Sequence, residues 1–168
     1  VKRRRRLADQ LITRLQVFHN SGEHKPAIRY VESVNGLRAM QKEYENLNED
    51  VLQIVGMDTL KQLYDPAEAK DHGDEMTHTG NRIRTIVVSS EPVCYPDTWN
   101  IEFVCVPPDV LEVKGEMTVC GDRLVLFSYT SGIIAIEICS KTIADTARAT
   151  LEMAWRWAKE WERKQKNG

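Results

Sequence analysis

Residues 117–129 (MTVCGDRLVLFSY) and 133–139 (IIAIEIC) are two strand-like segments joined by a turn at 130–132. β-Branched and other apolar residues dominate both segments, as they do in buried strands. Residues 140–142 (SKT) then open a long amphipathic helix. Strand, hairpin, strand and helix in this order indicate the closing unit of an α/β domain.

The final helix is expected to reach about Lys164. Thr142 and Asp145 have the spacing of a capping box, which predicts where the helix begins. Three tryptophans lie on it, and we expect them to pack in the core or in a dimer rather than to stack on a sugar or base. The apolar positions at helical spacing are Ile143, Ala147, Leu151, Ala154, Ala158 and Trp161.

Upstream of this unit, strand-like and helix-like segments alternate. A helix is expected after Asp58, which is a good N-cap residue, and Pro66 interrupts that helix before a loose continuation. Alternation early in the chain and consecutive strands later predict an α/β fold with a mixed β-sheet flanked by helices. The expected strands are 27–32, 50–57, 82–90 and 101–106, and the expected helical segments are 34–47, 58–64 and 67–80.

An amphipathic segment at 5–18 precedes this domain. Its apolar stripe, Leu7, Leu11, Leu15 and Phe18, predicts a helix that is too short to be stable alone. It must therefore pack on the domain or on a second copy, as the end of a coiled coil. We divide the chain into a linker helix (1–24) and one domain (25–168). Because the chain starts at a valine, we expect a piece of a longer protein.

Composition limits the class of protein. A hydrophobic content of 42% and a charged content of 29% are typical of a soluble globular domain, and a net charge of −2 argues against nucleic-acid binding across the whole surface. No apolar run approaches the length of a membrane span, and no apolar segment of a signal peptide follows the basic run 2–6. Four widely spaced cysteines predict free thiols in a cytoplasmic protein.

The sequence contains no motif for catalysis. The segment 71–78 (DHGDEMTH) holds metal-ligand residue types, but His72 and His78 are six positions apart and fall on different faces of a helix. We read this segment as an exposed polar helix or loop. A GxSxG elbow and a glycine-rich phosphate loop are also absent. We therefore expect no enzyme activity, no metal and no cofactor.

Ligands of open α/β sheets tend to bind beyond the carboxyl ends of the strands. In this chain those ends carry Asp58, Ser89, Ser90, Ser128 and Tyr129. Hydroxyl groups, a carboxylate and an aromatic ring suit a polar neutral molecule such as a sugar. The alternative is that these residues are polar only because turns are polar.

Four segments resemble the C-terminal effector domain of TrmB-like transcriptional regulators, a family related to the phospholipase D fold. They are KPAIRYVESVNGLRAM (25–40), NRIRTIVVSS (81–90), TVCGDRLVLFSY (118–129) and IIAIEICSKTIADTARATLEMAW (133–155). The resemblance implies an effector domain that senses a ligand, often a sugar, in a cytoplasmic homodimer without membrane contact. It also implies that DNA is bound only through a winged-helix domain, which this chain does not contain. The segment 1–24 is similar to the end of the family's linker.

Phospholipase D-like enzymes carry the motif His-x-Lys-x4-Asp, and this chain has Gly121, Arg123 and Ser128 at the matching positions. Glycine cannot replace the nucleophilic histidine, so the resemblance implies no phosphodiesterase activity. Arg123 keeps a group that binds anions. Two alternatives to a ligand-sensing domain are a degenerate hydrolase with an unrecognised nucleophile and a dimerisation scaffold without a ligand.

Overall fold

The computed structural model describes residues 26–62, 65–78, 81–130, 132 and 134–167. The predicted linker helix at 1–24 lies outside these residues. The described helices and strands are β1 (Ala27–Val31), α2 (Val34–Glu45), β2 (Val51–Gly56), α3 (Met57–Leu60), α4 (Pro66–His78), β3 (Ile83–Val88), β4 (Ile101–Val106), β5 (Gly115–Cys120), β6 (Arg123–Ser128), β7 (Ile134–Cys139) and α5 (Lys141–Asn167).

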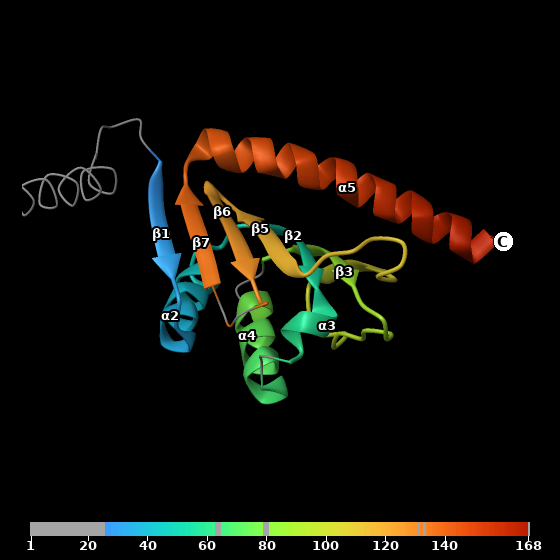
Figure 1. Cartoon of the computed structure of the whole chain (residues 1–168), viewed down its shortest axis with the longest axis horizontal. Helices are drawn as coiled ribbons and strands as arrows, with labels where there is room; N and C mark the ends of the chain where they lie inside the picture. Colours follow the sequence, from blue (N-terminus) through green and yellow to red (C-terminus); the bar gives the residue numbers. More distant parts are fainter. Residues whose placement is uncertain (1–25, 63–64, 79–80, 131, 133, 168) are drawn as a thin grey trace, which may run out of the picture.

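The seven described strands form a single mixed sheet in the order β1-β7-β6-β5-β2-β3-β4. β2, β3 and β4 are parallel, whereas β5, β6, β7 and β1 are joined by antiparallel pairing (Figure 1). As a result, β2, β3, β4 and β6 all end at the same edge of the sheet, which we call the carboxyl edge. The predicted α/β class, with helices flanking a mixed sheet, is confirmed.

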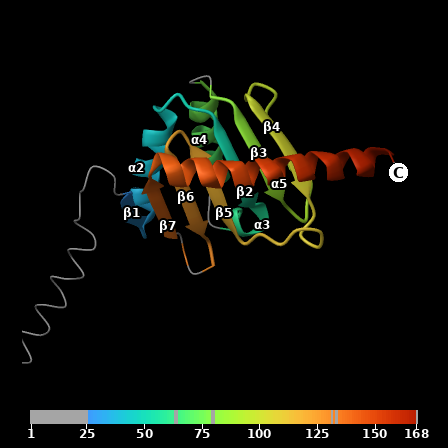
Figure 2. The same cartoon turned by 90° about the horizontal axis from the view of Figure 1, so that it is seen from above.

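Helices cover both faces of the sheet. α5 crosses one face, and α2 and α4 lie on the other (Figures 1 and 2). Strand residues alternate between these two faces, so two separate apolar clusters form. The cluster under α5 contains Leu52, Ile86, Val104, Val119 and Leu151, among others. The cluster on the face of α2, called the α2 face below, contains Leu37, Met40, Val51, Val125 and Ala135, among others.

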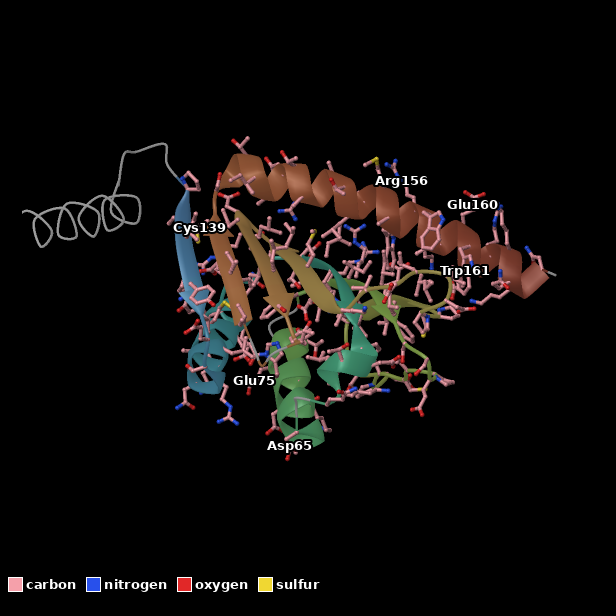
Figure 3. The ribbon with its side chains drawn as sticks, viewed as in Figure 1. Asp65, Glu75, Cys139, Arg156, Glu160 and Trp161 are labelled. Carbon is pink, nitrogen blue, oxygen red and sulfur yellow. The ribbon has the colours of Figure 1, made fainter. Side chains whose placement is uncertain are left out.

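α5 begins two residues earlier than the capping box predicts, because Ser140 rather than Thr142 is its N-cap. Ser140 is the residue before its first turn, and the Ser140 hydroxyl accepts a 3.5 Å hydrogen bond from the backbone N–H of Ile143. Asp145 instead pairs with Lys141 at 2.9 Å, so the predicted capping box is wrong. Figure 3 shows Trp161 on the side of α5 toward the sheet.

No helix in the described ranges has the length and apolarity needed to cross a membrane.

The prediction for Asp58 and Pro66 is also wrong. α3 is only four residues long, and Asp58 lies inside its first turn and makes no N-cap hydrogen bond. Pro66 is the first residue of α4 rather than an interruption, because a proline at this position has no N–H that the helix needs. Asp65 accepts a 2.7 Å hydrogen bond from the N–H of Ala67 and so caps that start.

A buried carboxylate joins four elements on the α2 face. Glu137 of β7 is 2% exposed, and its carboxylate lies 2.8 Å from Arg29 Nε of β1 and 3.1 Å from Arg123 Nη1 of β6. The Tyr44 hydroxyl of α2 donates to it at 2.8 Å. Glu43 of α2 completes the network by binding both arginines. Two cations and a hydroxyl therefore compensate the one buried charge.

Replacing Glu137 with alanine should strongly destabilise the fold. The change leaves two partly buried guanidinium groups with one carboxylate fewer, and we expect the free energy of unfolding to fall by about 3–5 kcal/mol. Urea unfolding monitored by circular dichroism measures this. The control is Glu112→Ala, which removes only a pair between Glu112 and Lys114, both about 70% exposed, and should leave the midpoint unchanged. A Glu137→Ala protein as stable as wild type would contradict the role of the network.

Candidate functional site

Five of the six residues predicted to bind a ligand lie at the carboxyl edge. Ser128 ends β6 and pairs with Gly115, the first residue of β5, which lies at that edge. Arg123 lies at the opposite edge, because it pairs with Cys120 and Cys120 in turn pairs with Val51, the first residue of β2. The remaining four, Asp58, Ser89, Ser90 and Tyr129, directly follow the ends of β2, β3 and β6.

Asp58, Ser89 and Ser90 are brought together and bind one another. The Asp58 carboxylate accepts hydrogen bonds from the Ser89 hydroxyl at 3.1 Å and from the Ser90 backbone N–H at 2.9 Å. Burial opposes its charge, but these hydrogen bonds outweigh burial and lower the pKa of Asp58. The carboxylate therefore fastens α3 to the end of β3.

Arg123 is already compensated by carboxylates. Its guanidinium lies 3.1 Å from Glu137 and 3.3 Å from Glu43, and it stacks 5.6 Å from the centre of the Tyr44 ring. Gly121, at the position of the motif histidine, has a φ of 54° in the turn between β5 and β6. Glycine adopts this backbone conformation at little cost, whereas most other residues do so rarely. The turn at Gly121 thus offers only its backbone.

Tyr129 leads to a carboxyl group that the sequence reasoning missed. Tyr129 is 4% exposed, and its hydroxyl donates to Glu116 Oε2 of β5 at 2.7 Å. The other oxygen, Glu116 Oε1, lies 2.6 Å from the Thr118 hydroxyl. Ser128, by contrast, is exposed, and the strand alternation points it to the α5 side of the sheet.

Thr118 belongs to a polar row across three strands of the α2 face. Gln53 of β2 pairs with Thr118 of β5 on one side and with Thr85 of β3 on the other. The Thr118 hydroxyl lies 3.3 Å from Gln53 Oε1. We call Thr118, Gln53 and Thr85 the Gln53 row. In the sequence, this row is marked only by polar residues at inward positions of apolar strands. These residues can be recognised as neighbours once the strand register is known.

Glu116 keeps its proton to a higher pH than an ordinary glutamate. Burial raises its pKa, and this effect exceeds the opposing effects of the Thr118 and Tyr129 hydrogen bonds and of the charge of His72. Within the described ranges, Glu116 forms no ion pair with a lysine or arginine. Tyr95 also lies close enough for Glu116 to raise its pKa, although burial contributes more.

A neutral Glu116 also completes the hydrogen-bond chain. A threonine hydroxyl donates only one hydrogen bond, so Thr118 cannot donate to both Glu116 and Gln53. If Glu116 carries the proton, it donates to Thr118 at 2.6 Å, and Thr118 donates to the Gln53 carbonyl at 3.3 Å. Burial thus favours proton uptake by Glu116, and the contacts with Thr118 and Gln53 accommodate that proton.

α4 and the loop before β4 lie beside the Glu116 carboxyl group. His72 of α4 is held by Glu45 of α2, with 2.8 Å between Nδ1 and Oε1. The Trp99 ring of the loop packs on Gly73, and its Nε1–H donates to Asp74 at 2.6 Å. Tyr95 packs against Trp99 and against Phe103 of β4, with ring centres 5.7 Å and 5.0 Å apart.

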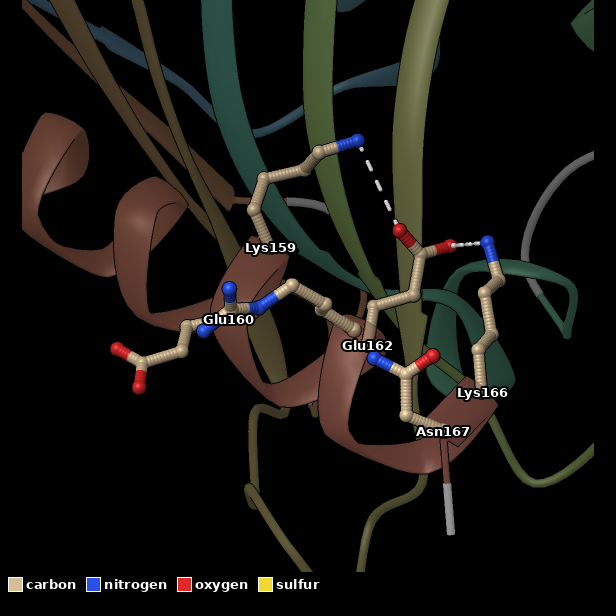
Figure 4. Close-up of a pocket in the computed structure, with 6 residues that line it drawn as sticks. Lys159, Glu160, Glu162, Lys166 and Asn167 are labelled. Carbon is tan, nitrogen blue, oxygen red and sulfur yellow. Dashed lines mark hydrogen bonds and ion pairs between the residues drawn. The ribbon is translucent and has the colours of Figure 1, made fainter.

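Two other regions, the segment 71–78 and the end of α5, give less indication of a binding site. No group of three metal-ligand residues occurs among the residues that the structure describes, and the side chain of His78 lies outside them. A surface hollow near the end of α5 is lined by residues of that helix alone, including Lys159, Glu162 and Lys166 (Figure 4). Glu162 pairs with both lysines, so the hollow presents a compensated, exposed surface.

Comparison with known proteins shows the fold. No family model and no curated protein matches the sequence. Among solved structures, the chain is similar to TrmBL2, an archaeal chromatin protein with a novel mode of DNA binding, at a TM-score of 0.55 and 10% identity. The match covers 93% of this chain but only 62% of TrmBL2. This chain shares the TrmBL2 fold.

NucT from Helicobacter pylori is also similar, with a TM-score of 0.52, 7% identity and coverage of 77% of this chain and 95% of NucT. These matches support the TrmB-like, phospholipase D-like fold that the sequence predicts. At such low identity they establish the fold and no activity.

Substituting Gly73 tests how α4 is fastened over the site. A Cβ atom at Gly73 would lie 2.0 Å from the Trp99 ring, which Asp74 and Tyr95 hold in place. We expect Gly73→Ala to lower the stability by about 1–3 kcal/mol through overpacking. Thermal unfolding measures the loss, with the exposed Asp71→Ala as the control on the same helix. An unchanged Gly73→Ala protein would contradict the close packing of Trp99.

The pKa of Glu116 predicts how stability depends on pH. Unfolding releases the proton once the pH exceeds the usual carboxyl pKa of 4.5, because the folded protein holds it to a higher pH. Glu116 therefore makes stability fall from pH 4.5 upward until the folded protein also ionises. Glu116→Gln removes this contribution, so its stability relative to wild type should rise over that interval. Thermal unfolding between pH 4.5 and 8 measures the difference, and a constant difference would contradict a neutral Glu116.

Proposed function

We propose that this chain is a ligand-sensing and dimerisation domain of a TrmB-like transcriptional regulator, and that it binds a small neutral polar effector such as a sugar without transforming it. One observation carries the proposal: a carboxyl group that pairs with no arginine or lysine among the described residues is hydrogen-bonded to a row of uncharged polar side chains, on a fold shared with TrmBL2. Such groups suit hydrogen bonding to an uncharged ligand.

The geometry of the turn supports a non-catalytic role. The position that aligns with the nucleophilic histidine of phospholipase D-like enzymes is Gly121, and its backbone φ of 54° disfavours any other residue. Arg123, which would hold a phosphate in that alignment, is engaged by two carboxylates. An anionic substrate would have to compete with both of them.

β1 suggests how ligand binding would reach a DNA-binding domain. β1 follows directly on residues 1–24, and Arg29 ties it to Glu137 in β7 and Glu43 in α2. In the proposal, the effector shifts the balance between two arrangements of the dimer, and β1 passes this shift to the linker. DNA contact belongs to a domain outside this chain.

Purified protein of residues 1–168 provides the test. Light scattering should give the mass of a dimer, and a neutral sugar from a panel should raise the melting temperature. The same protein should not hydrolyse bis(p-nitrophenyl) phosphate. A monomer that no sugar stabilises would contradict the proposal, and phosphodiester turnover abolished by a point substitution would favour the hydrolase alternative.

A further inference from the structure

Thr85 in the Gln53 row has an unused hydroxyl group. Thr85 is fully buried on β3, and its Oγ1 has no hydrogen-bond partner among the described residues. Most buried polar groups in proteins have a partner, so an unpaired hydroxyl indicates a partner that the chain alone does not supply. Its register places Thr85 beside Gln53, on the same face of the sheet.

Gln53 is the next group with unused capacity. Its carbonyl lies 3.3 Å from the Thr118 hydroxyl, but its amide nitrogen has two N–H groups and no hydrogen-bond partner within the described part of the chain. Gln53 is half-buried, as is Glu116, so both remain accessible from solvent. The row therefore combines donors on Gln53 with a hydroxyl on Thr85 that both donates and accepts.

The described residues around the Gln53 row offer no arginine or lysine to an anionic ligand. Among the described residues Glu116 pairs with no lysine or arginine, and Arg123, which does carry a positive charge on the α2 face, lies at the opposite edge and is compensated. An anion bound at the Gln53 row would gain no ion pair from an arginine there, and among the described residues only the charge of His72 is felt at Glu116. A neutral molecule with neighbouring hydroxyl groups can accept from the half-buried Gln53 amide, and it can exchange a hydrogen bond with the buried Thr85 hydroxyl once it displaces the side chains that cover Thr85.

We propose that the Gln53 row, together with Glu116, is the effector site of this domain and that it binds a neutral ligand bearing adjacent hydroxyl groups. The proposal rests on the sensing function above and gives it a location. It places the ligand on the α2 face rather than among Asp58, Ser89 and Ser90, whose hydrogen bonds are already made within the chain. The aromatic ring of Tyr95 borders the site on the side of β4.

Nuclear magnetic resonance of the 15N-labelled chain tests this directly. Glucose, sucrose and inorganic phosphate serve as probes, and the side-chain amide signal of Gln53 is assigned from its loss in Gln53→Leu. We expect a sugar to shift that signal in a saturable manner and phosphate to leave it unchanged. A Gln53 signal that no sugar moves, or that phosphate moves with higher affinity, would overturn the proposal.

Substitutions then distinguish the Gln53 row from the carboxyl edge as the place where the ligand binds. Gln53→Leu and Thr85→Val each remove a hydrogen bond to the ligand, and each should weaken sugar binding about tenfold or more. Glu116→Gln keeps a neutral group that donates and accepts, so it should retain binding, whereas Glu116→Leu should lose it. Ser89→Ala is the control at the carboxyl edge and should bind as wild type. The melting temperature of each variant without sugar shows that it folds.

The outcomes distinguish the site from the function. Sugar binding that survives Gln53→Leu but fails in Ser89→Ala would overturn this site and leave the sensing function standing. Loss of binding in Glu116→Gln would overturn the assignment of a neutral carboxyl to the site. If no sugar stabilises the wild-type chain or shifts its amide signals, both the site and the sensing function are contradicted.

Discussion

Burying a carboxyl group requires either a compensating cation or a proton, and the α2 face contains one example of each. Glu137 is almost completely buried and is compensated by Arg29 and Arg123, with Tyr44 donating a further hydrogen bond. Because these partners come from β1, β6 and α2, the position of the edge strand depends on this one carboxylate. If the two cations were absent, the cost of leaving the charge unpaired would be comparable to a large part of the stability of a small domain.

Glu116 lies on the same face but in a different environment. Two hydroxyl groups bind it, and burial raises its pKa more than these hydrogen bonds and the charge of His72 lower it. The two carboxyl groups therefore have different roles on one surface. Glu137 holds elements together through its ion pairs, whereas Glu116 leaves neighbouring polar groups available. Among these are the Gln53 amide N–H groups and the Thr85 hydroxyl, which find no partner in the part of the chain that the structure describes.

The arrangement of the strands connects these two places. β5 carries Glu116, its neighbour β6 carries Arg123, and β7 beyond it carries Glu137 and pairs with β1. A shift at Glu116 would reach β1 through two neighbouring strands and the ion pairs that join them. α4 is placed to respond as well, because Trp99 packs on Gly73 and Glu45 holds His72.

The sequence by itself determined the α/β class, most strands and helices to within a few residues, and the presence of Gly121 where a nucleophile would be needed. These features follow from local periodicity and from turn residues, both of which can be read within a short segment of sequence. The segment 117–129, expected as one strand-like segment, instead forms β5 and β6 on either side of the turn at Gly121. The sequence also misplaced the starts of α4 and α5, since proline and serine both suit more than one position near a helix start. Only the tertiary structure separated Arg123 from Ser89, gave it carboxylate partners, and aligned Thr118, Gln53 and Thr85 across three strands. The pairing register makes these residues neighbours, and register depends on contacts between segments distant in the chain.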